Sequence, residues 1–188
     1  DILRNHDFGK YEFFGYSVAA TPPDALTLSL QKGFSAWRDL AGSSHLEVAQ
    51  AIRADDIDIL IDLAGHTKGG QLSLLALRPA PVQAHYLGYS ATIGARFLDY
   101  LITDHLQVPP EQRSYFTENL VYLPDTFMAT QRAPIAIEGP SRADCGLPEK
   151  AFVFANFNIH YKIEPNIFGI WMRLLRKTPD AVLWLGRG

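Results

Sequence analysis

The stretch Ala151–Leu185, AFVFANFNIHYKIEPNIFGIWMRLLRKTPDAVLWL, contains a strand pattern, a helix pattern and a second strand pattern in succession. Ala151–Asn156 and Ala181–Leu185 are rich in the β-branched and aromatic residues that favour strands. Between them apolar residues recur at helical spacing from Ile163 onward, and Pro165 fits the first helical turn. Because two parallel strands need a crossover connection, this order predicts a β-α-β unit and an α/β fold.

The preceding part of the chain alternates in the same way. The strands predicted there are 11–20, 57–63, 82–87, 100–103 and 119–123, and the helices are about 24–40, 46–54 and 71–77, with a short helix or turn opening at 109–111. Residues 57–63 are predicted to form a buried parallel strand, and Asp24 is a candidate N-cap. Residues 129–148 show no periodicity and carry three prolines, which indicates a connection between two units.

Composition narrows the class of protein. The 188 residues are enough to bury a core without staples, and the net charge of −3 argues against a nucleic-acid partner. Cys145 is the single cysteine, which excludes an intrachain disulfide and a cysteine-based zinc site. No apolar run reaches the roughly 18 residues that span a bilayer, so we expect no membrane span.

Ligands of open α/β sheets bind beyond the carboxyl ends of the strands. Four loops follow predicted strands at such ends: 65–70, 88–94, 157–162 and 186–188. Lys162, at the entry of an amphipathic helix, is either a diphosphate clamp or an exposed loop lysine. The loop 88–94, with two glycines, two hydroxyls and an aromatic ring, either lines a sugar pocket or forms a structural turn.

The histidines leave similar alternatives open. His66 and His160 lie on candidate loops, where either is a possible general base, although a lone loop histidine is more often structural. His85 lies within a strand pattern and is predicted to be either a core residue with satisfied hydrogen bonds or a residue on a sheet face. Asp62 is predicted to cap or pair locally, and Cys145 to be inert.

Several motifs occur in a fixed order along the chain. They are DILIDLAGHTKG (58–69), ALRPAPVQ (76–83), LGY (87–89), DYLITD (99–104), CGLPE (145–149), NFN (156–158), YKI (161–163) and VLWL (182–185). Together they closely resemble the catalytic region of the O-linked N-acetylglucosamine transferase family, the OGT/SPINDLY glycosyltransferases of family 41.

The resemblance implies a GT-B type α/β fold with two Rossmann-like lobes and mostly parallel sheets. Residues 1–128 would be the C-terminal portion of the N-terminal lobe, 129–148 a connector, and 149–188 the first β-α-β unit of the C-terminal, nucleotide-binding lobe. The family's His-Pro and His-Thr-Thr motifs would lie outside these residues. We therefore expect an internal part of a longer, bacterial-type enzyme that is inactive alone, with too few C-terminal strands to cover the apolar face of its helix.

The family moves N-acetylglucosamine from UDP-N-acetylglucosamine to protein Ser or Thr hydroxyls, with inversion and without a required metal or other cofactor. The resemblance places Lys162 on the essential lysine that contacts the diphosphate, and Leu87 and Gly88 close to the donor sugar. The other donor-binding candidates on these loops are Tyr89, Thr92, Asn158, Tyr161, Gly186 and Arg187. Ser90-Ala91 and Ile159 depart from the usual family residues, Pro-Gly and Gln.

Two other functions remain open from the sequence. The altered residues Ser90-Ala91 leave room for another nucleotide sugar such as GDP-fucose, and a non-catalytic interaction module with the same fold is also possible. The expected partners are a nucleotide sugar, protein acceptors, the remainder of the catalytic region and N-terminal tetratricopeptide repeats. The expected location is the cytoplasm.

Overall fold

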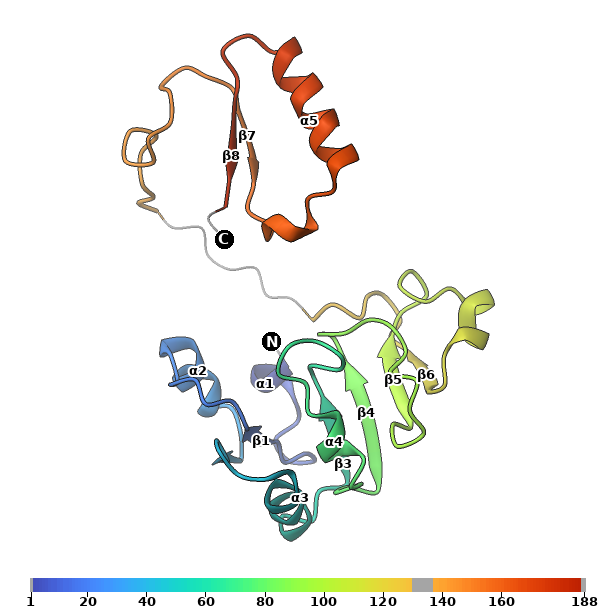
Figure 1. The fold of residues 1–188 in the computed structure, drawn as a ribbon. Coiled ribbons are helices and arrows are strands. Elements are labelled where there is room, and N and C mark those ends of the chain that lie inside the picture. Colours follow the sequence, from blue (N-terminus) through green and yellow to red (C-terminus); the bar gives the residue numbers. More distant parts are fainter. Residues whose placement is uncertain (1, 130–136, 187–188) are drawn as a thin grey trace. The chain divides into compact units, whose positions relative to one another are not determined.

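The computed structural model describes residues 2–129 and 137–186, and the chain divides into two compact units, Asp1–Arg132 and Ala133–Gly188 (Figure 1). The division falls inside the predicted connector 129–148. Each unit contains strands that pair in parallel, which confirms the α/β class. The assignment of the two units to parts of two lobes stays a prediction.

The elements follow one another in the predicted alternation. In the first unit they are α1 (Ile2–Asn5), β1 (Phe14–Ser17), α2 (Ala25–Gln31), β2 (Ala36–Asp39), α3 (His45–Ala54), β3 (Ile59–Asp62), α4 (Leu72–Leu75), β4 (Val82–Tyr86), β5 (Tyr100–Thr103), the 3-10 helix η1 (Pro110–Tyr115) and β6 (Asn119–Tyr122). In the second unit they are β7 (Val153–Asn156), the 3-10 helix η2 (His160–Lys162), α5 (Pro165–Lys177) and β8 (Val182–Leu185).

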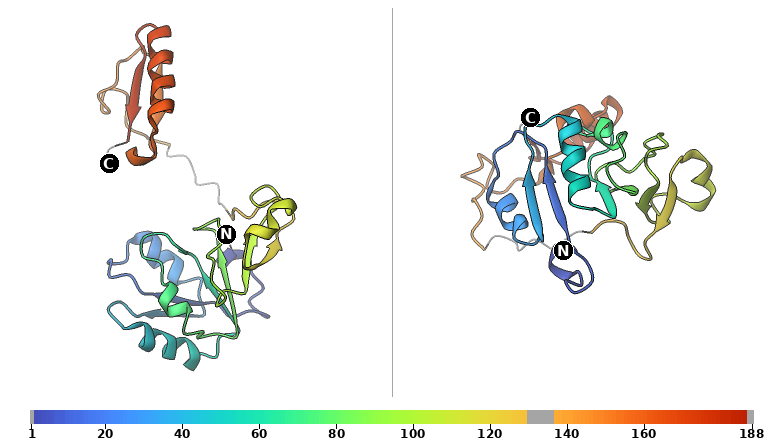
Figure 2. Two further views of the ribbon diagram at one scale, coloured as in Figure 1. Left: turned by 45° about the vertical axis from the view of Figure 1, so that its right-hand side comes forward. Right: turned by 90° about the horizontal axis from the view of Figure 1, so that it is seen from below.

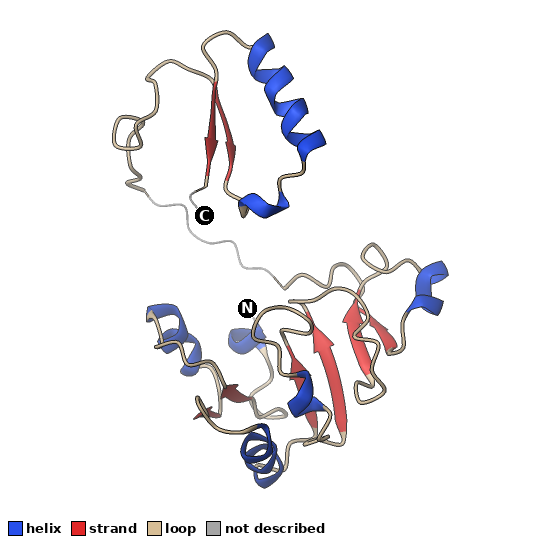
Figure 3. Ribbon diagram, viewed as in Figure 1, coloured by secondary structure: helices blue, strands red, loops and turns tan. Residues whose placement is uncertain are grey.

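The main sheet of the first unit has the strand order β3-β4-β5-β6, with every neighbouring pair parallel (Figures 1 and 3). Leu75 of α4 packs with Ile93 and Leu98, which come from the segment between β4 and β5, and Leu60 of β3 packs against this cluster. Since the strands are parallel and in register, their carboxyl ends meet at one edge of the sheet.

Helix α3 links the main sheet to the β1–β2 pair. Ser44 begins it with a capping box: its hydroxyl accepts from Glu47 N, and Glu47 reaches back to the Ser44 backbone N–H. Its buried residues Val48, Ala49 and Ile52 pack with Leu74. The side chains around them include Tyr16, Leu40 and Leu60, so α3 lies beside the β1–β2 pair, as Figure 2 shows.

The helix predicted over 24–40 is wrong in its second half. Asp24 caps α2 as predicted, because its carboxylate accepts from Thr27 N at 2.7 Å, but the helix ends at Gln31. Gly33 disfavours its continuation, and Ala36–Asp39 instead forms β2, which pairs in parallel with β1. The strand β2 forms because it pairs with β1, more than twenty residues earlier in the chain. Such a distant partner produces no local pattern in the sequence from which the strand could be predicted.

The strand predicted over 57–63 is parallel but not buried. Leu60 faces the core clusters, whereas Ile59 and Ile61 point to the other side of the sheet and are 58% and 42% exposed. The sequence could not distinguish one buried face from two. Similarly, only Phe14–Ser17 of the predicted strand 11–20 is paired.

The second unit is a β-α-β unit, with β7 and β8 parallel. Pro165 lies in the first turn of α5, as predicted, yet α5 contains no buried residue. Its apolar side leaves a cavity of about 320 Å³ lined by Phe154, Trp171 and Leu174, among others. This confirms that two strands do not cover the apolar face of the helix.

Candidate functional site

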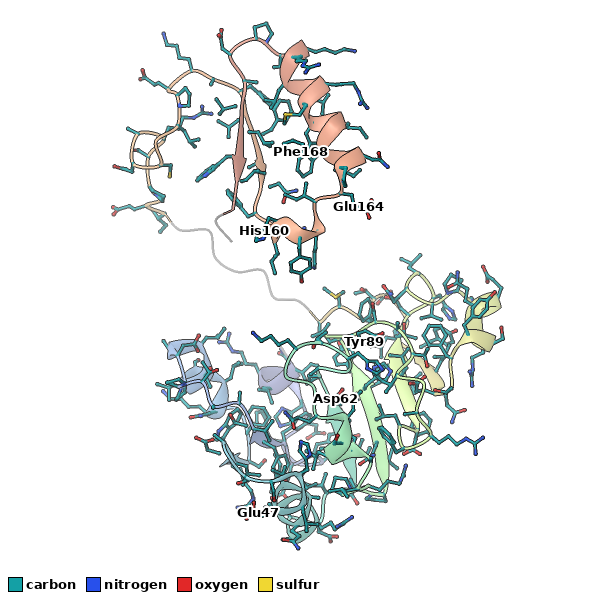
Figure 4. The ribbon with its side chains drawn as sticks, in the orientation of Figure 1. Glu47, Asp62, Tyr89, His160, Glu164 and Phe168 are labelled. Carbon is teal, nitrogen blue, oxygen red and sulfur yellow. The ribbon has the colours of Figure 1, made fainter. Side chains whose placement is uncertain are left out.

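Two of the predicted loops meet at the carboxyl edge of the main sheet. Asp62 and His85, near the ends of β3 and β4, are register partners, so the segments that follow them start side by side. Figure 4 shows Tyr89 just beyond the end of β4 and Asp62 on β3. Asp62 accepts a hydrogen bond from Gly65 N at 2.6 Å, which confirms the predicted local cap.

The backbones of these two loops approach each other closely. A Cβ at Gly88 would overlap the carbonyl oxygen of Leu63, and a Cβ at Gly65 would lie 2.6 Å from the Cβ of Tyr89. Glycine is therefore required at both positions on steric grounds. The close approach fixes where the loop after β4 begins.

Leu87 has a backbone conformation that is unusual for its residue type. Its φ is +69°, in the left-handed region, and its side chain is 37% exposed. A non-glycine residue in this region costs on the order of 1–2 kcal/mol. Such strain concentrates at ligand-binding sites, and Leu87 is one of the residues predicted to approach the donor sugar.

Farther along the same loop, side chains from two other segments hold the main chain at Ile93. His66 Nε2 lies 3.0 Å from the carbonyl oxygen of Ile93, and Glu118 Oε1 accepts from Ile93 N at 2.7 Å. The ring of Tyr89 meets that of His66 edge-on, with centroids 5.3 Å apart. The carbonyl oxygen can only accept, so His66 carries its proton on Nε2 and acts here as a positioning group.

Thr92 faces the same carboxylate. Its hydroxyl donates to Glu118 Oε2 at 2.7 Å and accepts from Gly94 N at 3.0 Å. Thr92 was predicted to bind the donor, and the structure shows its hydroxyl engaged within the protein. Glu118 was not predicted at all, because an isolated acidic residue before a strand carries no motif.

A buried pair of ionisable groups lies beneath the loop. His85 and Glu118 are 1% and 0% exposed, and His85 Nε2 lies 3.7 Å from Glu118 Oε1. Burial lowers the pKa of His85, although the Glu118 and Asp62 carboxylates oppose this shift. Burial alone would raise the pKa of Glu118, but hydrogen bonds from Thr92 and Ile93 N lower it below its usual value.

The prediction that His85 is a core residue is correct, but its hydrogen bonds are not satisfied. Neither ring nitrogen has a hydrogen-bond partner of normal geometry within residues 2–129 and 137–186, although the main chain of Tyr89 lies close enough to oppose the lowering of the His85 pKa. The sequence places His85 within a strand, but it cannot show that the Glu118 carboxylate lies just beyond hydrogen-bond range.

In the second unit, the loop after β7 carries most of the other predicted residues. Lys162 ends the 3-10 turn η2, and its backbone N donates to Ile159 O at 3.0 Å. It lies ahead of α5, whose N-cap is Glu164, rather than within the first turn of that helix. Lys162 is exposed, and Figure 4 shows neighbouring His160 and Glu164 at the same end of the unit.

The remaining candidates of this unit lie on the same loop or at the end of β8. Asn158 N donates to Asn156 Oδ1 at 2.8 Å, and Tyr161 is 73% exposed. Gly186 N donates to Asn156 O at 2.9 Å, which ties the end of β8 to the end of β7. Arg187 lies outside the described residues. The structure brings Asn158, Tyr161 and Gly186 to one edge of the β7–β8 pair. The role of these residues in donor binding stays a prediction.

The site offers no metal-binding cluster in the part of the chain that the structure describes: no group of three or more His, Cys, Asp or Glu side chains there is placed to hold an ion. In the second unit, the exposed ammonium of Lys162 carries a charge that suits a phosphate.

Parallel strands with polar loops at their carboxyl ends define an α/β protein, and the GT-B type follows from its structural neighbour. A mutant O-GlcNAc transferase from Thermobaculum terrenum superposes with a TM-score of 0.83 at 33% identity, over 98% of this chain and 34% of that chain. The model of glycosyl transferase family 41 matches residues 1–136 and 129–188. The chain therefore belongs to glycosyl transferase family 41.

Curated relatives agree with this family. The chain is 35% identical to the Arabidopsis thaliana protein "Probable UDP-N-acetylglucosamine--peptide N-acetylglucosaminyltransferase SEC", over 99% of this chain and 20% of that protein. It is 38% identical to the SPINDLY protein of the same species, which carries the same enzyme name, over 96% of this chain and 20% of that protein. The chain thus spans about a fifth of the length of these relatives.

These names bear on the predicted alternative donor, and the structure bears on the expected absence of a membrane span. Both plant proteins are named for UDP-N-acetylglucosamine, so they give the GDP-fucose alternative no support. Within residues 2–129 and 137–186, no helix has the length and apolar character needed to cross a bilayer.

Proposed function

We propose that this chain supplies donor-binding parts of a protein O-GlcNAc transferase, which moves N-acetylglucosamine from UDP-N-acetylglucosamine to Ser or Thr hydroxyls with inversion. The proposal rests on the conformation of the loop after β4 in a chain that belongs to family 41. In this loop Leu87 has a positive φ, and Gly88 packs against the main chain of the loop after β3. A rigid main chain presented at a strand end suits recognition of a sugar.

In this reaction the acceptor hydroxyl attacks the anomeric carbon while the bond from that carbon to the UDP oxygen breaks. Negative charge develops on the departing diphosphate. The exposed ammonium of Lys162 is the group that we assign to neutralise that charge, without a metal ion. Asn158, Tyr161, Gly186 and Arg187 are proposed to complete the binding of the nucleotide, and Leu87, Gly88 and Tyr89 that of the sugar.

We assign His66 to loop positioning and not to proton transfer, since its Nε2 already contacts the Ile93 carbonyl oxygen. Protein acceptors, the tetratricopeptide repeats, the rest of the catalytic region and a cytoplasmic location belong to the same proposal, supported by the family.

The test is transfer by the full-length protein. It is incubated with a mixture of acceptor proteins and either UDP-N-acetylglucosamine or GDP-fucose, and modified Ser and Thr residues are read by mass spectrometry. The proposal expects N-acetylhexosamine on the acceptors and UDP release that depends on them. Preferential fucose transfer would reject the donor, and tight UDP binding without any turnover would instead indicate a non-catalytic module.

A further inference from the structure

The carboxylate of Glu118 is fully buried at the base of the loop after β4, and among the described residues its side-chain hydrogen bonds come from two short segments. Oε1 accepts from Ile93 N at 2.7 Å, and Oε2 accepts from the hydroxyls of Thr92 at 2.7 Å and Thr117 at 3.2 Å. Glu118 is 0% exposed, so it does not contact a ligand itself. Its effect on any ligand must pass through the loop.

The carbonyl group of Ile93 lies in the next peptide group along the chain, and a different segment holds it. His66, from the β3 loop, contacts the carbonyl oxygen of Ile93, while Glu118 takes its amide. Because one side chain holds the N–H of Ile93 and another holds its carbonyl oxygen, neither of these two successive peptide groups can rotate freely. The left-handed Leu87 and the close contact of Gly88 with Leu63 fix the other end of the loop.

We propose that Glu118 is a positioning residue for the donor sugar, which acts through Thr92 and the Ile93 amide to hold the loop 88–94 in its sugar-binding shape. The inference rests on the proposed function for the identity of the sugar. It also changes the role expected for Thr92, whose hydroxyl serves the loop rather than the ligand.

The chemistry of the contact requires a carboxylate. Thr92 Oγ1 already accepts from Gly94 N at 3.0 Å and from Thr117 N at 3.3 Å, which occupies both of its lone pairs. The Thr92 hydroxyl can therefore act only as a donor toward residue 118. In Glu118→Gln the amide NH₂ would face either the Thr92 hydroxyl or the Ile93 N–H, and neither can accept, so one of the two contacts is lost in either orientation although the size is preserved.

The experiment compares the affinities of the full-length protein for UDP-N-acetylglucosamine and for UDP, both measured by isothermal titration calorimetry. UDP lacks the sugar, so a loop that positions the sugar affects only the first affinity. Glu118→Gln and Thr92→Val are expected to weaken sugar-nucleotide binding about ten-fold, the effect of one lost hydrogen bond to a charged group. UDP binding is expected to change by less than about two-fold.

Asp99→Asn is the matched control. Asp99 also accepts from a main-chain amide, Gln83 N at 2.9 Å, but at the amino ends of the strands, where it pairs with Arg78. This control is expected to lower the unfolding temperature and leave the ratio of the two affinities unchanged. Thr92→Ser, which retains the hydroxyl, is expected to bind the sugar nucleotide more tightly than Thr92→Val.

A double-mutant cycle completes the test. If Glu118 and Thr92 act through one contact, the double variant Glu118→Gln/Thr92→Val loses no more sugar-nucleotide affinity than the worse single variant. Equal weakening of UDP and UDP-N-acetylglucosamine, no weakening of either, or additive losses would overturn the proposal. If Glu118→Gln does not fold, the comparison of Thr92→Val with Thr92→Ser decides. A wild-type protein that does not bind UDP-N-acetylglucosamine would reject the proposed function instead.

Discussion

Replacement of Lys162 by alanine is expected to slow sugar transfer without lowering the stability of the protein. The side chain is exposed, and within residues 2–129 and 137–186 no hydrogen bond or ion pair of its ammonium occurs. A surface substitution of this kind changes the free energy of unfolding by no more than about 0.5 kcal/mol. Lys162→Ala is therefore expected to leave the unfolding temperature of the full-length protein nearly unchanged.

The expected loss of transfer is much larger. Two unit charges about 4 Å apart interact by about 4 kcal/mol at an effective dielectric constant near 20. If that attraction is available only as charge develops on the leaving diphosphate, its loss slows the reaction by about 1,000-fold. This agrees with the roughly 100- to 1,000-fold effect of removing a single donor that stabilises developing negative charge.

The assay is steady-state UDP release in the presence of acceptor protein, with the unfolding temperature measured on the same samples. Lys177→Ala is the control, because Lys177 is also exposed and lies in the last turn of α5, at the other end of that helix. It is expected to retain transfer. A Lys162→Ala protein with transfer within about ten-fold of wild type would refute the assigned role, and a matching fall in unfolding temperature would attribute the loss to folding.

Three further predictions follow from the described contacts. Gly88→Ala places a Cβ against the Leu63 carbonyl oxygen and should lower the free energy of unfolding by about 1–3 kcal/mol in chemical denaturation, whereas Gly139→Ala, which meets no atom within 4 Å, should not. Because burial keeps the pKa of His85 below 6.5, the unfolded chain binds more protons as the pH falls below that value, and stability falls. His85→Gln should show a smaller drop in unfolding temperature between about pH 6.5 and pH 5, and an equal drop in both proteins would exclude His85 as the cause. In the 188-residue chain, the amides of α5, which has no buried residue, should exchange with deuterium faster than those of α3, which has three; strong protection of α5 would contradict this.

The elements with strong local signals were correctly predicted. The helix predicted over 46–54 is α3, where the structure adds a capping box at Ser44, and the amphipathic pattern after Pro165 correctly predicts α5. Prediction failed where a distant partner decides the structure. Ala36–Asp39 is a strand because it pairs with β1, and Ile59 is exposed because it lies on the edge strand β3, where only the side that carries Leu60 packs on the core clusters.

The candidate site divides in the same way. Its loops could be predicted, since they follow strands and carry glycine and polar residues, and the sequence also points to Lys162 at the entry of an amphipathic helix. The contacts that shape the loop after β4 could not be predicted. Glu118 and His66 lie 25 and 27 residues from Ile93, in opposite directions along the chain, and neither belongs to a recognisable motif with it.

The sequence alone thus determined the α/β class, the family resemblance and the loops at the strand ends, because periodicity, caps and linked motifs are local in the chain. Only the tertiary structure shows that His66 positions the loop after β4 and that the Thr92 hydroxyl donates to Glu118. It also shows that Glu118 is buried beneath this loop. The physical reason is that a hydrogen bond depends on the separation and direction of two groups in space, and parallel strand pairing brings together groups far apart in sequence.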